Sequence, residues 1–443
     1  MIFNINSISP ALQKLIIGLL FCHGSLTTMA QNPAPAPAQS KSILIKNVQL
    51  HDGNGKTYNN ASIGFNEGKI TFLSYLNMDE KNNSWDSIID AKGQHVYPGL
   101  IALNTNIGLS EIEALRAMND YSETGSINPN ARAIIAYNTD SKVTPTVRFN
   151  GILTAQITPS GGLVSGTSSI VSLDAWNWED AVYKSDEGVH INWPSMNVYY
   201  GQKSNEEDFE KKQKERIEKE LKNLEAFFED SYNYHLNNKP NPKNLILESM
   251  RGIFDNTKKL YIHANFAKQI MAAVNLCNKY KINFVLVGGS EANMVINLLK
   301  DNNIPVILGQ THQLPLREDE PIDAPYTLPK KLQDAGILYA LSCNGFWQVR
   351  NLPFIAGTAV AYGLTQEQAL SSITINAARK AGIDKTTGSI EIGKDATLIL
   401  CQGDILDMKS SVINRAFIMG KSVSLDNVQH QLYLKYKSKY NID

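Results

Sequence analysis

Cysteine is scarce in this sequence, and no cluster of metal-binding cysteines is present. Among 443 residues there are four cysteines, of which Cys277, Cys343 and Cys401 are widely separated and only Cys22 lies near the N-terminus. Three distant cysteines in the body of the chain indicate no disulfide framework. The lack of any Cys-x-x-Cys pair or Cys/His cluster gives no indication of a structural zinc site.

An excess of one charge is lacking as well. The 42 basic and 43 acidic residues give a net charge of −1 and a pI near 6.7. Nothing therefore favours nucleic acid or an anionic membrane as a partner. With 43% hydrophobic residues, the chain can bury a sizeable core.

The N-terminus has the composition of a secretory signal peptide. Lys14 precedes an apolar run over residues 15–22, and residues 28–30 form a plausible cleavage site. The run is too short to span a bilayer, so we expect no membrane span. We expect residues 1–30 to be removed and the mature protein to be exported, either periplasmic or secreted, with a Pro/Ala-rich linker over residues 31–41.

Two alternatives for this segment are weaker. A buried N-terminal helix is disfavoured by the extended linker that follows it. Lipid attachment at Cys22 is not expected, because Leu20 and Phe21 make a poor recognition sequence before it.

The two ends of the remaining chain predict β-strands. Strand patterns cover residues 43–48 and 396–400, and hairpin patterns cover residues 62–73 and 416–423. Two β-rich ends around a different middle indicate one small sheet domain, built from residues 42–98 and 388–443.

The middle, residues 99–387, alternates short apolar runs with helical stretches, as a parallel barrel requires. The strands expected are residues 151–158, 259–263, 282–287, 304–308 and 336–341, with helices at 264–280 and 291–303. Thr365 and Gln368 match a capping box at the start of a further helix. The charged segment 205–229 is expected to be an exposed helix. Not all eight strands can be assigned between residues 110 and 260.

The first barrel strand carries a pair of amides. After Pro98-Gly99, the apolar run 100–103 leads to Asn104 and Asn106. Because residues i and i+2 of a regular strand point the same way, we expect both amides to enter one pocket.

This stretch resembles the amidohydrolase superfamily, whose first barrel strand reads Pro-Gly-Leu-Ile-Asp followed by His-x-His. Residues 374–379 and 388–396 resemble the family's return from the barrel to the sandwich, so the resemblance covers about residues 42–423. It is nearest to the imidazolonepropionase-like branch. It implies an α/β fold, a TIM-like (β/α)8 barrel with a small β-sandwich domain formed by both termini.

The resemblance also places the family's metal ligands on this chain. Asn104 and Asn106 stand where the family has two histidines, Gly288 where it has another, and Asn344 where it has the aspartate that acts as general base. Only His263 keeps the type of ligand, and the ligand of the fourth strand cannot be placed. One imidazole with neutral amides binds zinc weakly, so the divalent metal of the family is expected to be weak or absent.

Other polar residues could rebuild a site. His312 follows an expected strand and is a candidate for the substrate pocket, together with Asn104, Asn106, His263 and Gly288. His190 is a further candidate donor; the alternative for it and for His312 is a hydrogen-bonded loop histidine. Two carboxylates, Glu111 and Glu113, follow the asparagine pair, where the start of a helix is the simpler explanation.

The family's chemistry is hydrolysis of non-peptide or dipeptide-like C–N bonds by metal-activated water. Here we expect it to be weakened or lost. The alternative is a catalytically inactive protein that binds a small molecule or a partner in the emptied barrel pocket. A small-molecule substrate or ligand is expected in either case, and a homo-oligomer is left open.

Overall fold

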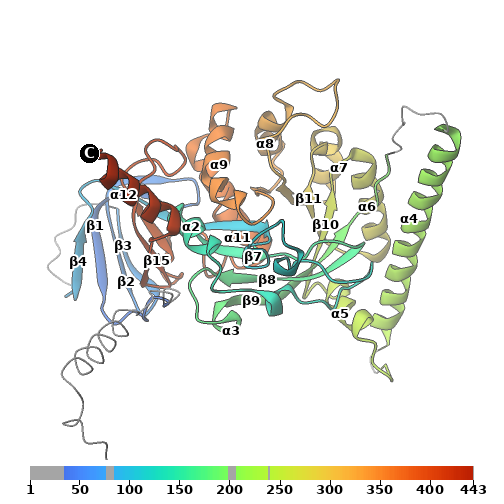
Figure 1. Cartoon of the computed structure of the whole chain (residues 1–443), viewed down its shortest axis with the longest axis horizontal. Coiled ribbons are helices and arrows are strands. Elements are labelled where there is room, and N and C mark those ends of the chain that lie inside the picture. The colour runs from blue at the N-terminus through green and yellow to red at the C-terminus, as the bar shows by residue number, and fades with distance from the viewer. Residues whose placement is uncertain (1–33, 76–83, 198–205, 238–239, 443) are drawn as a thin grey trace, which may run out of the picture. The chain divides into compact units, whose positions relative to one another are not determined.

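The structure is a computed structural model that describes residues 34–75, 84–197, 206–237 and 240–442. The expected signal peptide, with Cys22, lies outside these residues. The described chain contains two eight-stranded sheets (Figure 1).

The first sheet is built from both ends of the chain, as predicted. Its strands run in the order β16-β15-β14-β5-β1-β2-β3, with β4 paired to β1. In chain order they are β1 Ile43–His51, β2 Thr57–Asn66, β3 Lys69–Ser74, β4 Ser87–Asp90, β5 His95–Pro98, β14 Leu398–Cys401, β15 Ile413–Ile418 and β16 Lys421–Val423. Phe65 from the N-terminal part meets Phe417 from the C-terminal part edge-on, with ring centroids 5.1 Å apart. Both rings are buried, so neither end of the chain forms this core alone.

The second sheet is the barrel. Its strands follow chain order: β6 Leu100–Thr105, β7 Ile152–Ile157, β8 Val164–Ser172, β9 Val182–Asn192, β10 Lys259–Ala264, β11 Phe284–Gly288, β12 Val306–Leu308 and β13 Tyr339–Leu341. Beyond the two outer strands, the Asn106 N–H donates to the Gly345 carbonyl at 3.3 Å, which brings the edges of the sheet together. The α/β barrel with a terminal sheet domain is the predicted fold.

One strand departs from the expected parallel arrangement. Strand β8 is antiparallel to both β7 and β9. Only residues 158–163 separate β7 from β8, too few for the crossover of a dozen or more residues that a parallel pair needs. The short connection therefore imposes a hairpin in the region where the sequence pattern left strands unassigned.

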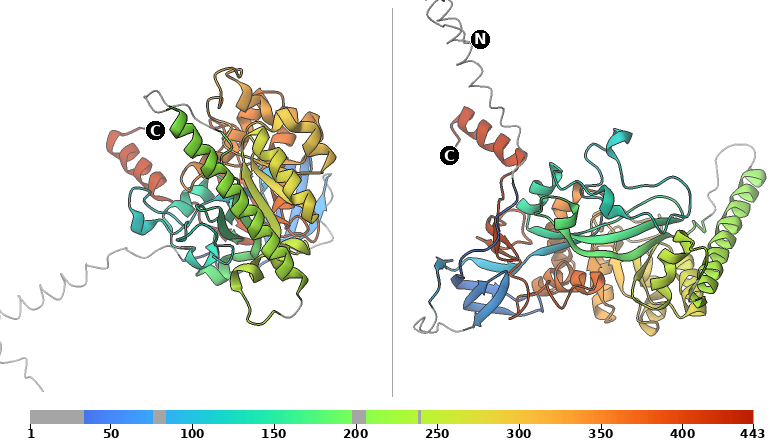
Figure 2. Two further views of the ribbon diagram at one scale, coloured as in Figure 1. Left: turned by 90° about the vertical axis from the view of Figure 1, so that its right-hand side faces the viewer. Right: turned by 90° about the horizontal axis from the view of Figure 1, so that it is seen from below.

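Helices cover part of the barrel sheet, and α12 projects away from it (Figure 2). They are α2 Val143–Phe149, α3 Trp178–Ala181, α4 Glu206–Leu236, α5 Leu245–Phe254, α6 Ala267–Tyr280, α7 Ile296–Asp301, α8 Ala324–Asp334, α9 Leu352–Ala361, α10 Gln366–Ser372, α11 Ile375–Ala381 and α12 Val428–Tyr440. The predicted capping box at Thr365 and Gln368 is confirmed at the start of α10. The predicted helix over 291–303 is divided into a 3-10 turn, Ala292–Val295, and α7.

A buried ion pair ties the barrel to the terminal sheet. Arg148 of α2 donates to Asp174 at 2.8 Å, and both side chains are buried. Lys421 of β16 lies 3.5 Å from the other carboxylate oxygen, which also accepts from the Ala36 N–H at 3.0 Å. Segments far apart in the sequence thus meet at one carboxylate.

We expect Arg148→Met to lower the free energy of unfolding by about 3 kcal/mol, because it leaves a buried carboxylate with one of its charge partners removed. Lys330→Met is the matched control: it breaks the exposed pair with Asp334 on α8 and should cost less than about 1 kcal/mol. Chemical denaturation measures both. Equal losses in the two variants would contradict the role given to the buried pair.

Candidate functional site

The carboxyl end of β6 is bulged rather than regular. Asn104 has φ +55°, and the pairing of β6 with β7 shifts between Ala102 and Thr105. The expectation that Asn104 and Asn106 share one face assumed regular alternation, and the bulge removes that basis. The Asn106 side-chain amide donates to the Thr158 carbonyl at 2.9 Å, and the Asn104 N–H donates to Gln156 Oε1 at 3.0 Å.

Two histidines from neighbouring strands are in direct contact. His190 Nδ1 of β9 lies 2.9 Å from His263 Nε2 of β10. The other ring nitrogen of His190, Nε2, lies 2.8 Å from Ser168 Oγ of β8. The His190 ring is fully buried and stacks on Tyr261, with centroids 4.6 Å apart, whereas His263 keeps partial exposure. Of the sequence candidates, these two are joined by a hydrogen bond.

Below the histidines lies a buried carboxylate, Glu187 of β9. Its Oε1 accepts from Gln156 Nε2 at 2.6 Å and from Ser168 Oγ at 2.5 Å, and its Oε2 accepts from the Tyr261 hydroxyl at 2.8 Å. We call these four residues with His190 and His263 the buried polar network. It joins four adjacent strands, β7 to β10.

When Glu187 is ionised, the network determines which ring nitrogens carry protons. An ionised Glu187 accepts the hydrogen bond that the Ser168 hydroxyl donates, so Ser168 Oγ accepts from His190 Nε2–H. His190 Nδ1 must then accept from His263 Nε2–H. This leaves His263 Nδ1 as the nitrogen with a free lone pair, at the partly exposed end of the chain of hydrogen bonds.

Burial controls the charge of these groups. It lowers the pKa of His190 well below its ordinary value, and the neighbouring His263 lowers that pKa further. Burial lowers the pKa of His263 to about 4. Both imidazoles are therefore neutral near pH 7. The pKa of Glu187 is raised by burial, against the opposing effect of its three hydrogen-bond donors.

The donor set does not fit a catalytic zinc ion of the expected kind. Such a site needs about three protein ligands and an open position. Both nitrogens of His190 and both oxygens of Glu187 are engaged within the network. Within the described ranges, no group of three or more His, Cys, Asp or Glu residues is placed to hold a metal ion.

The remaining sequence candidates lie at other strand ends. Gly288 ends β11 with φ +96°, and an added Cβ would lie 2.5 Å from Asn265 Oδ1; only glycine is tolerated there. His312 Nε2 is 2.8 Å from Thr358 Oγ1 of α9, the hydrogen-bonded loop alternative. Asn344 is exposed after β13. Their convergence with Asn104, Asn106 and His263 on one ligand stays a prediction.

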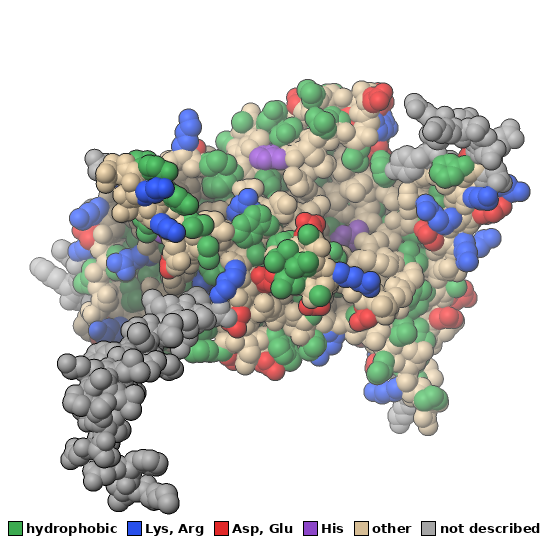
Figure 3. Space-filling view, in the orientation of Figure 1, with side chains coloured by type: hydrophobic (Ala, Val, Ile, Leu, Met, Phe, Trp, Pro, Cys, Tyr) green, Lys and Arg blue, Asp and Glu red, His purple; other side chains and the backbone are tan. Residues whose placement is uncertain are grey.

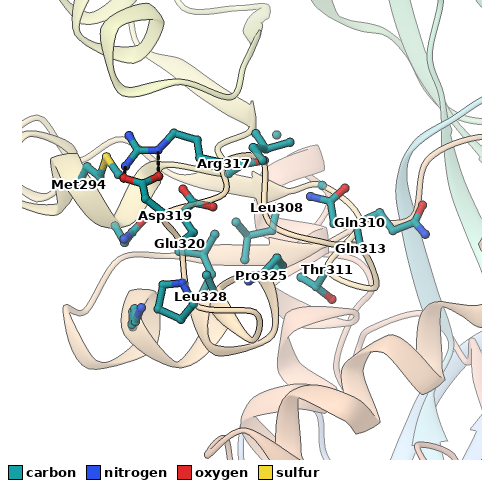
Figure 4. Close-up of a pocket in the computed structure, with 18 residues that line it drawn as sticks. Met294, Leu308, Gln310, Thr311, Gln313, Arg317, Asp319, Glu320, Pro325 and Leu328 are labelled. Atoms are coloured by element: carbon teal, nitrogen blue, oxygen red, sulfur yellow. Dashed lines mark hydrogen bonds and ion pairs between the residues drawn. The ribbon is translucent and has the colours of Figure 1, made fainter.

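A cavity of about 200 Å³ lies beside the ends of β11 and β12 (Figure 4). Gly288 and Leu308 line it from the strands, and Leu328 lines it from α8. On its polar side Arg317 pairs with Asp319 at 2.7 Å. Of the residues predicted for the pocket, Gly288 is among its lining residues, whereas His263 and His312 are not.

Sequence reasoning missed Gln156, Ser168, Glu187 and Tyr261. One signal was available, because Tyr261 and His263 are separated by two positions on an expected strand and so share a face. Gln156 lies within an apolar run and Glu187 lies between expected strands. Nothing local in the sequence distinguishes these two from surface residues.

Comparison with known proteins agrees with this architecture. The model of the amidohydrolase family matches residues 201–423, about half of the chain. The chain belongs to the amidohydrolase family. The fold of this chain is similar to that of an amidohydrolase from Thermotoga maritima MSB8, with a TM-score of 0.73. The two sequences are 23% identical, and the match covers 86% of this chain and 99% of the other.

Two curated relatives are imidazolonepropionases. The one from Picrophilus torridus is 30% identical over 177 residues, 38% of this chain and 43% of that protein. The one from Flavobacterium psychrophilum is 33% identical over 112 residues, 23% of this chain and 27% of that protein. The chain thus matches less than half the length of either relative.

We expect the free energy of unfolding to fall as the pH is lowered from about 6.5 to about 4. The folded pKa of His263 lies below its ordinary value of 6.5, so in this window the unfolded state binds more protons and acid favours unfolding. The contribution of His263 is about 3 kcal/mol. Chemical denaturation at a series of pH values measures it. His263→Asn should reduce the slope; an unchanged slope in this variant contradicts the assignment.

Proposed function

We propose that the barrel mouth binds a small amide-containing molecule, and that family-type hydrolysis by metal-activated water is weak or lost. The observation that carries the proposal is the hydrogen bond between His190 Nδ1 and His263 Nε2. It occupies imidazole nitrogens that a metal would otherwise need. Loss of the metal ligands at Asn104, Asn106, Gly288 and Asn344 is part of the same proposal.

The chemistry of water activation supports weak or absent hydrolysis. Without a metal ion, a bound water keeps a pKa near its bulk value instead of about 7. Asn344 cannot accept a proton at neutral pH, so it cannot serve as general base. The scaffold is retained, and a fold does not by itself carry its family's activity.

A second candidate function is hydrolysis without a metal, favoured by the hydrogen-bond chain that ends at His263. Water would attack the amide carbonyl carbon and give a proton to His263 Nδ1. Transfer along His190 and Ser168 would carry a proton to Glu187, whose pKa burial raises. The same chain would then run in reverse: Glu187 would return its proton through Ser168 and His190, and His263 would donate its Nδ1 proton to the departing nitrogen as the C–N bond breaks.

The names of the two curated relatives suggest where to look for a ligand. An imidazolone bearing a propionate is the first candidate, followed by other five-membered cyclic amides, linear amides and dipeptides. A cavity of about 200 Å³ suits a ligand of this size.

We expect protein purified without added metal to contain well under one zinc per chain, measured by elemental analysis. Ligand binding, measured by calorimetry against the panel above, should persist after treatment with a chelator, because the proposal assigns no ligand contact to a metal. Stoichiometric zinc whose removal abolishes hydrolysis would overturn the proposal.

Turnover assays of the metal-free protein and its variants distinguish the two candidate functions. Metal-independent turnover that falls about a hundredfold or more in His263→Asn and Glu187→Gln, a loss typical of removing a general base, would favour the second. His235→Asn on α4, outside the network and the pocket candidates, is the matched control and should leave turnover unchanged. Ligand binding without turnover in the wild-type protein would favour the first.

We also propose that the protein is exported, on the composition of residues 1–30. Within residues 34–75, 84–197, 206–237 and 240–442, no helix is both long and apolar enough to cross a membrane. We expect N-terminal sequencing of protein recovered outside the cytoplasm to begin near Gln31. Exported protein that retains residues 1–30, or protein confined to the cytoplasm, would contradict this.

A further inference from the structure

Among the residues that the structure describes, the C-terminal helix α12, Val428–Tyr440, contacts α2 near its first turn. Gln429 accepts a hydrogen bond from Thr146 of α2 at 2.6 Å, and His430 packs against Phe149 with ring centroids 5.5 Å apart. No residue of the helix is buried, and Figure 2 shows it projecting from the barrel and sheet.

The projecting part of α12 is both apolar and basic. Its large apolar residues are about half exposed: Leu432 47%, Tyr433 57%, Leu434 49%, Tyr436 50% and Tyr440 61%. Its charged residues are Lys435, Lys437 and Lys439, with no acidic residue between positions 428 and 440. Figure 3 shows hydrophobic and basic side chains side by side over this helix. A helix with this much exposed apolar surface is typical of an interaction site.

A groove of about 780 Å³ opens at the base of the helix. Its walls come from the segment after β6, the segment after β13 and the start of α12. They are lined by Glu111, Ile112, Glu113, Met118, Asn138, Asp140, Lys142, Val143, Phe346, Trp347, Gln348, Val428 and Gln429. Three acidic residues face one lysine, and Ile112 and Met118 are 48% and 42% exposed. Glu111 and Glu113 lie in irregular chain rather than at the expected start of a helix.

We propose that two copies of the chain associate, with α12 of each copy lying in the groove of the other. The helix brings three lysines and a row of aromatic and aliphatic side chains. The groove offers three carboxylates around an apolar floor. Charge and apolar character are thus complementary between two surfaces whose apolar side chains are exposed within the described part of the chain.

Helix α12 does not fill the groove of its own copy. Only Val428 and Gln429 of α12 line the groove, and the side chains from Leu432 onward lie beyond it. Thirteen helical residues extend about 20 Å, enough to reach across a two-fold axis near the helix start. In a dimer with two-fold symmetry, each contact between α12 of one copy and the groove of the other occurs twice.

The exchange also bears on the barrel mouth. The groove is bounded by the segments that follow Asn106 and Gly345, which are themselves joined by the backbone hydrogen bond at 3.3 Å. The partner's helix would therefore cover the β6 and β13 side of the mouth.

Sedimentation velocity of the full chain over a concentration series tests the proposal. We expect a reversible monomer–dimer equilibrium. The triple variant Lys435→Glu, Lys437→Glu, Lys439→Glu should raise the dimer dissociation constant by roughly tenfold or more, since it sets like charges against each other. Because α12 has no buried residue, the variant chain should fold normally, and its circular dichroism should match the wild type.

Two comparisons make the test specific. Adding Glu111→Lys, Glu113→Lys and Asp140→Lys to the triple variant should restore the dimer by reversing both partners. Lys211→Glu, Lys219→Glu and Lys222→Glu on exposed α4 make the same change in charge elsewhere and should leave the dimer intact. A monomer at every concentration overturns the proposal, as does a dimer insensitive to the α12 variant. Wild-type protein that stays monomeric but sediments with anionic phosphatidylserine vesicles would assign α12 to a membrane surface instead.

Discussion

The buried carboxylate of Glu187 is the constraint on which the centre of the barrel depends. A charge taken out of water costs several kcal/mol unless hydrogen bonds replace its hydration. Gln156, Ser168 and Tyr261 supply those bonds from three other strands. Ser168 lies on the antiparallel strand β8. The strand that departs from the parallel arrangement therefore supplies one of the hydrogen-bond donors to this carboxylate.

From that carboxylate the polar chain runs outward to the mouth. Ser168 orients His190, and His190 orients His263. The two imidazoles are therefore hydrogen-bonded to each other. The barrel thus holds a continuous hydrogen-bonded network from Glu187 to His263. Membership of the amidohydrolase family describes the barrel and its terminal sheet, and it does not by itself assign a reaction to these side chains.

Different strand ends of the barrel carry different features. The network ends at His263 on β10, the cavity lies beside β11 and β12, and the acidic groove lies between the segments after β6 and β13. Placing sites at the carboxyl ends of strands is general for such barrels. Here the bulge at Asn104 and the left-handed Gly288 shape two of those ends through the backbone rather than through side chains.

The sequence by itself determined the elements whose cause is local. The capping box at Thr365, the hairpin over residues 62–73, the exposed helix α4 and most barrel strands follow from side-chain pattern and turn chemistry within a few residues. Tertiary structure alone decided the direction of β8, the break in alternation at Asn104 and the meeting of Glu187, His190 and His263. Those outcomes depend on which distant strand supplies a hydrogen-bond partner, and no short-range pattern encodes that choice.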